Sequence, residues 1–104
     1  MTDRELLELA AKAAGIEIYD WFSESVPIVR SGDDGIVWRP LTDDGDALRL
    51  VSTLGIHLQF AVGFTVAYAG SVYAKQFTEH NETDQHASTR RAIVRAAAAT
   101  GANQ

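Results

Sequence analysis

The feature that most constrains this chain is a run of 25 residues without a formal charge, between Arg49 and Lys75. A run of this length is long enough for a helix that crosses a bilayer. However, three glycines interrupt it, and from Ile56 onward apolar and polar residues alternate with period two, as in a β-strand. The run therefore predicts strands that contribute to a folded core, and not a membrane-spanning helix.

Helix signals lie on both sides of these strands. Thr2 and Glu5 have the spacing of a capping box, and either Thr42 or Asp43 can cap a second helix. A third helix is expected to end at Gly101, because glycine readily adopts the left-handed conformation that follows a helix. The expected helices cover residues 2–14, 42–54 and 84–100.

The remaining apolar segments predict short strands. Residues 31–35 are expected to form a five-residue hairpin loop and residues 79–85 a polar loop. Short links favour antiparallel pairing, with the helices gathered on one face of the sheet. The expected strands are 16–21, 26–30, 36–39, 56–62, 64–68 and 72–77. We therefore predict a single α+β domain over residues 1–104, with an antiparallel sheet of five to six strands and the order α-β-ββ-α-βββ-α.

A short similarity relates the two halves of the chain. Both internal helices are followed by a glycine and an alternating strand, in residues 14–18 and 54–58. This pattern is compatible with an internal duplication, but helix–glycine–strand is also a common junction.

Charge and composition exclude several classes of protein. Nine basic and fourteen acidic residues give a net charge of −5, which disfavours a general nucleic-acid binder. The chain has no cysteine, which excludes thiolate and cysteine–zinc chemistry. Its charged N-terminus is not typical of a signal peptide. There is also no glycine-rich phosphate loop, no Gly-x-Ser-x-Gly and no His-Glu-x-x-His motif, so we predict no catalytic residue, metal site or cofactor.

Two acidic clusters are candidates for binding a partner protein. Asp33 and Asp34 form one, and Asp43, Asp44 and Asp46 form the other. They could face a basic, nucleic-acid-binding surface of a partner, although turns and helix caps also explain most of them.

Tryptophan and arginine side chains are further candidates. Trp38 would join the partner-binding surface if its ring were exposed, although we expect both Trp21 and Trp38 in the core. Arg90, Arg91 and Arg95 on the last helix are an alternative, anion-binding set. Pairing with the acidic loops or with the negative end of a helix is the simpler role for them.

Histidines and acids are concentrated in residues 79–86. His80 and His86 with the neighbouring acids could hold zinc or manganese, but no standard ligand spacing is present. A solvated loop that leads into a capped helix explains the same residues. His57 is expected on the more polar face of its strand, as a sheet-surface residue.

Three segments together resemble the NinX-like family of small phage and prophage proteins: residues 1–16, 38–50 and 87–97. The resemblance implies a phage-encoded accessory protein made in the cytoplasm of a bacterial host. It supplies no enzymatic activity and no catalytic residues.

These observations favour a non-enzymatic accessory protein that binds a host or phage protein. The most specific version of this hypothesis is that the protein inhibits a host defence system such as CRISPR-Cas. A small-ligand protein that binds or sequesters a nucleotide is the alternative, and a metal-dependent enzyme is a weaker one. We expect no membrane partner and no direct nucleic-acid binding, while pairing of exposed sheet edges would allow a homodimer.

Overall fold

Capping residues set the ends of the first two helices, α1 (Asp3–Ala14) and α2 (Asp44–Leu54). The Thr2 hydroxyl accepts from the backbone N–H of Glu5, and the Asp43 carboxylate accepts from that of Asp46. Both helices end at a glycine with positive φ, at 71° and 65°. The sequence prediction for these helices is confirmed, and Asp43 is the cap of the second.

The last helix, α3 (Gln85–Ala102), begins where it was expected, with Asp84 as its cap. Its end differs from the prediction, because Gly101 lies inside the helix and is buried. A side chain there would overlap the backbone of Leu9 on α1. This glycine therefore permits close helix packing instead of ending the helix.

Sheet A consists of β1 (Ile18–Ser23), β2 (Val26–Ser31) and β3 (Asp34–Val37), paired antiparallel in that order. β1 starts two residues later than expected. Ser31 pairs with Asp34, so the expected five-residue loop is a two-residue turn with Gly32 at φ 66°. The strands therefore continue to pair as far as Ser31 and Asp34, because a glycine with positive φ allows the chain to reverse within two residues.

Sheet B consists of β4 (Ile56–Ala61), β5 (Phe64–Ala69) and β6 (Phe77–His80), again antiparallel in chain order. The structure describes residues 1–69, 76–80 and 84–103, so most of the strand expected at 72–77 lies outside the described residues. The expected loop at 79–85 is wrong for Glu79 and His80, which pair with β5. Pairing with β5 makes these two residues part of a strand, although their side chains are polar.

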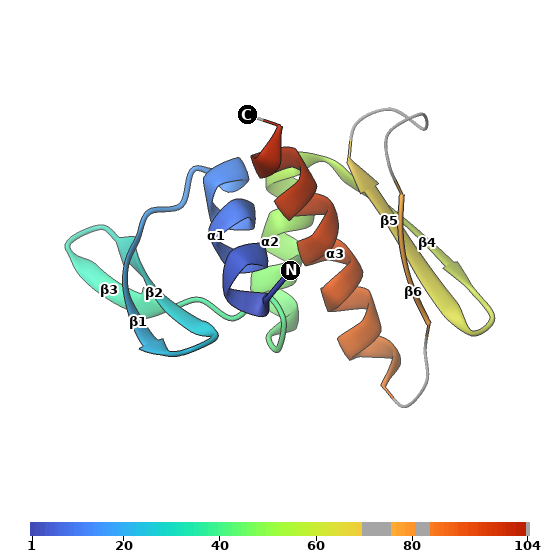
Figure 1. The fold of residues 1–104 in the computed structure, drawn as a ribbon, viewed down its shortest axis with the longest axis horizontal. Coiled ribbons are helices and arrows are strands. Elements are labelled where there is room, and N and C mark those ends of the chain that lie inside the picture. Colours follow the sequence, from blue (N-terminus) through green and yellow to red (C-terminus); the bar gives the residue numbers. More distant parts are fainter. Residues whose placement is uncertain (70–75, 81–83, 104) are drawn as a thin grey trace.

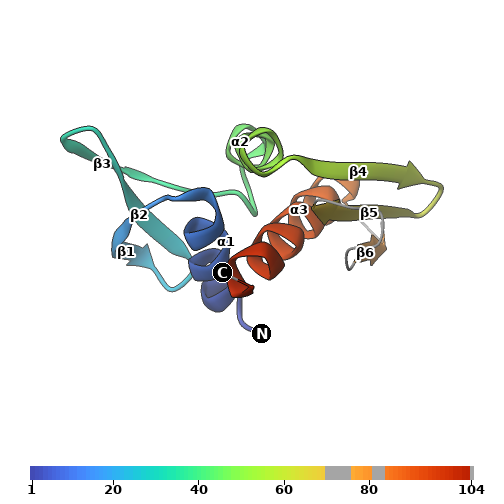
Figure 2. The same cartoon turned by 90° about the horizontal axis from the view of Figure 1, so that it is seen from above.

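The six strands form two sheets, and not the one sheet covered on one face that we expected (Figure 1). The three helices lie between the sheets, with sheet A on the side of α1 and sheet B on the side of α3 (Figures 1 and 2). The predicted α+β class and element order are confirmed. The molecule measures 42 × 30 × 23 Å along its principal axes.

The helices supply most of the core. Fully or nearly buried residues come from all three of them: Leu7, Ala10, Leu50, Val94 and Ala97. Small side chains on α3 allow it to pack closely against α1 and against sheet B. Among the described residues, no helix has the length and apolar character needed to cross a bilayer.

Candidate binding groove and sheet surface

The acidic cluster at the start of α2 is used within the fold. The Asp46 carboxylate accepts from the Arg39 backbone N–H at 2.9 Å and from Arg49 Nη1 at 2.7 Å. Asp44 pairs with Arg90 at 2.6 Å, and Asp43 is the helix cap. Capping and ion pairing therefore account for all three acids, as the simpler prediction had it.

The second cluster, Asp33 and Asp34, lies at the turn between β2 and β3. Both residues are exposed, and within the described part of the chain neither carboxylate makes a hydrogen bond or an ion pair. The structure thus separates the two predicted clusters. Of the five acids in these two clusters, only Asp33 and Asp34 have carboxylates without a partner in the described part of the chain.

The three arginines of α3 bind acidic residues of other elements. Arg90 binds Asp44, Arg91 binds Asp3 at 2.8 Å, and Arg95 binds Glu79 at 2.8 Å. Such pairs tie α3 to the start of α2, to α1 and to β6. Arg91 Nε also lies 3.9 Å from the Glu79 carboxylate that Arg95 binds, so the anion on which these two arginines converge is a side chain of the fold itself. The geometry matches the role of pairing across the fold.

The histidine-rich segment gives no metal centre in the described part of the chain. No three histidine, aspartate or glutamate side chains approach one another closely enough there to hold an ion. His80 lies on β6 in edge contact with Phe64, and His86 lies in the first turn of α3. His57 is exposed on β4 and stacks on Tyr68 across the sheet, with ring centroids 4.9 Å apart.

The two tryptophans both pack against the core from sheet A. Trp38 follows β3 and is only 4% exposed, so its ring offers little surface to a partner. Trp21 is half-buried, and the Arg4 guanidinium lies 4.3 Å from its ring centroid. The expectation that both belong to the core is confirmed, and the partner-binding role considered for Trp38 has no exposed ring to support it.

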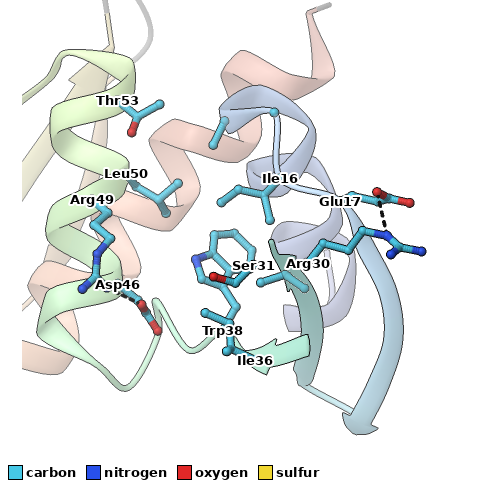
Figure 3. Close-up of a pocket in the computed structure, with 13 residues that line it drawn as sticks. Ile16, Glu17, Arg30, Ser31, Ile36, Trp38, Asp46, Arg49, Leu50 and Thr53 are labelled. Carbon is cyan, nitrogen blue, oxygen red and sulfur yellow. Dashed lines mark hydrogen bonds and ion pairs between the residues drawn. The ribbon is translucent and has the colours of Figure 1, made fainter. Parts of the chain in front are cut away.

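A groove of about 670 Å³ lies between sheet A and α2 (Figure 3). Trp38 and Leu50 form its apolar floor, and Ile16 and Ile36 line its edge. The Asp46–Arg49 ion pair borders it on α2, while the Glu17–Arg30 pair on the side of the sheet points away from it (Figure 3). Of its lining residues, only Trp38 and Asp46 were candidate site residues from the sequence.

Sheet A also carries exposed apolar side chains. The described residues include eight large hydrophobic side chains that are exposed, and half of these lie on sheet A: Tyr19, Phe22, Ile36 and Val37. Val29 faces the core, so its neighbour Ile28 and the cross-strand partner Val37 point away from the helices.

Tyr19 extends this outward face toward β3. A side chain at Gly35 would overlap the Tyr19 hydroxyl and lie against Ile28, so the tyrosine ring crosses the sheet above β2. The Arg30 guanidinium lies 5.3 Å from the centroid of that ring. We call the surface of Tyr19, Ile28, Arg30, Gly35 and Val37, with the neighbouring Phe22, the outer face of sheet A.

Sequence reasoning missed most of this outer face and of the groove. Adjacent aromatic residues at 21 and 22 were a usable signal, because the two side chains cannot both enter one core from one strand. The groove has no comparable signal, since its walls come from segments far apart in the sequence.

Comparison with known proteins gives no relative from which a role can be transferred. No family model matches the chain, and no curated protein or solved structure is significantly similar to it. The resemblance to the NinX-like family stays a prediction.

Proposed function

We propose that this protein is a non-catalytic module that binds another protein through the outer face of sheet A. The observation that carries the proposal is the group of exposed apolar side chains on this face, Tyr19, Phe22 and Val37, with Phe22 70% exposed. Aromatic residues are enriched in protein interfaces and supply much of their binding energy. Exposed apolar side chains grouped in this way are typical of an interaction surface.

The charge of the same region specifies the kind of partner. Residues 17–37 contain five acidic residues and one arginine, so this segment holds −4 of the net charge of −5. Asp33 and Asp34 lie at its hairpin, and their carboxylates have no partner in the described part of the chain. Complementary charge accelerates association and selects partners. The partner surface is therefore basic around an apolar centre.

The resemblance to phage accessory proteins supplies the setting of this proposal. The partner is then a host or phage protein in the bacterial cytoplasm. A nucleic-acid-binding protein, such as an effector of a host defence system, has a basic surface of the required kind. Inhibition of such a system is the narrower form of the proposal, and it rests on the resemblance.

Affinity capture tests the proposal. The tagged chain is mixed with lysate of a Gram-negative host at low and at physiological salt, and retained proteins are identified by mass spectrometry. We expect a specific protein to be retained, and less of it at the higher salt because screening weakens charged contacts. Asp33→Asn should reduce retention, while Glu8→Gln removes an exposed charge on α1 and should not.

Two results would contradict the proposal. One is an empty capture at both salt concentrations. The other is a retained protein that Asp33→Asn and Glu8→Gln hold equally well, because its binding would not involve sheet A.

A further inference from the structure

We propose that the groove between sheet A and α2 binds a small, uncharged, planar aromatic molecule that accepts a hydrogen bond from the indole N–H of Trp38. This site lies on the inner side of sheet A, opposite the outer face. The inference therefore does not depend on the proposed partner protein.

The first support is a buried donor without an acceptor. The Trp38 backbone N–H donates to the Pro27 carbonyl at 3.0 Å, but its indole N–H makes no hydrogen bond to any described residue. The residue is only 4% exposed, and its indole nitrogen is turned toward the gap in front of α2 (Figure 3). Buried polar groups in proteins nearly always have a partner. An acceptor in the groove would complete this one.

The second support is the size and lining of the groove. Its volume of about 670 Å³ lies within the range typical of sites for small organic molecules. Thr53 on α2 lies across this floor from Ile16 and Ile36 (Figure 3). Two facing walls over an apolar floor form a slot, which suits a flat apolar body.

The third support is the balance of charge at the rim. Arg49 Nη1 lies 2.7 Å from the Asp46 carboxylate on the α2 side of the groove, whereas the Glu17–Arg30 pair points away from the groove (Figure 3). The two charged groups on the groove side, Asp46 and Arg49, sum to zero, so they supply no net charge with which to attract an anion. This selects an uncharged ligand over a phosphate-bearing one.

Nuclear magnetic resonance of the indole N–H groups tests this inference directly. The chain has two tryptophans, and Trp21→Phe leaves a single indole signal, which belongs to Trp38. Adenosine, guanosine, cytidine and uridine are the probes. We expect at least one of them to shift the Trp38 indole signal in a saturable way at millimolar concentration or below. No shift with any probe would overturn the inference and leave water as the partner of this N–H.

Matched variants locate the binding. Thr53→Phe places a ring in the groove and should weaken binding of the same probe about tenfold or more. Ser52→Phe adds the same ring at the neighbouring exposed position, which does not line the groove, and should leave binding unchanged. Ile36→Phe places a ring in the groove from the opposite side, and it replaces Thr53→Phe as the blocking variant if Thr53→Phe impairs folding. Equal binding by the blocking and control variants would overturn the assignment to the groove.

A charged probe tests the chemical class. The 5′-monophosphate of the bound nucleoside should bind no more tightly than the nucleoside. Binding of the monophosphate that is tighter by about tenfold would overturn the assignment to uncharged ligands.

Discussion

Gly101 shows how one residue sets the distance between two helices. It lies in the last turn of α3, where the backbone of Leu9 on α1 occupies the place of a side chain. The neighbouring Ala97 and Ala98 are also buried. Glycine and alanine at this contact let the two helices approach closely, and any larger residue must separate them.

We predict that Gly101→Ala destabilises the protein by about 1–3 kcal/mol, since the methyl group meets backbone atoms that cannot rotate away. Gly45→Ala is the control, because Gly45 is also helical and the atoms nearest to its added methyl belong to side chains that can move, Asp43 Oδ2 at 3.2 Å and Arg49 Nη1 at 3.7 Å. An ordinary helical Gly→Ala change is stabilising by about 0.5–1 kcal/mol. Denaturant unfolding gives both values, and equal effects of the two substitutions would contradict the packing role of Gly101.

At the scale of the element, α3 depends on its first residues for a satisfied start. The Asp84 carboxylate accepts from the backbone N–H groups of Ala87 and His86, at 3.1 and 3.0 Å. The bond from Ala87 contributes most to holding the pKa of Asp84 below its ordinary 3.8, and desolvation opposes the shift. The bond from His86 and the charges of Arg90 and His86 lower this pKa further.

A stability change with pH follows from this cap. Because the pKa of Asp84 is lower in the folded than in the unfolded chain, its contribution is fully present above the unfolded pKa and is lost as the pH falls through the folded one. Asp84→Asn should lower the melting temperature at neutral pH and flatten its decline below about pH 4. Thermal unfolding at a series of pH values from 7 downward measures both effects. If the melting temperature of Asp84→Asn declined at acidic pH in the same way as that of the wild type, the role of the carboxylate would be contradicted.

Helices of this chain are easier to predict than strands, for a physical reason. Thr2, Asp43 and Asp84 act within one turn of chain, so their capping role can be recognised from local sequence. The strand status of Glu79 and His80 depends on pairing with β5, more than ten residues away. Gly101 is an exception among the helix signals, because its role depends on a contact with α1 that only the folded structure reveals.

At the scale of the whole molecule, the chain has the order α-βββ twice, followed by α3. The junction similarity at residues 14–18 and 54–58 falls at the start of both triplets of strands. Local patterns predict the first five strands and the antiparallel pairing, but β6 begins only where the strand expected at 72–77 was to end. The division into two sheets depends on how the helices pack. The same is true of the groove, whose walls come from both sides of that packing.

The distribution of charge predicts the state of the molecule in solution. A symmetric dimer formed through sheet A would bring two copies of the segment 17–37, each with charge −4, against one another. We therefore expect sedimentation at physiological salt to give the monomer mass of 11.3 kDa. A dimer that Phe22→Ser dissociates would contradict this and would make a second copy the occupant of the outer face.

The most direct test of binding through sheet A compares two exposed phenylalanines on opposite sheets. Phe22 on β1 is 70% exposed and Phe60 on β4 is 59% exposed, so replacing either with serine should leave the fold intact. The measurement is the dissociation constant of each variant for the captured partner. We predict that Phe22→Ser weakens binding about tenfold or more, as at an interface hot spot, and that Phe60→Ser does not. Equal affinities, or a loss confined to Phe60→Ser, would contradict binding through the outer face of sheet A.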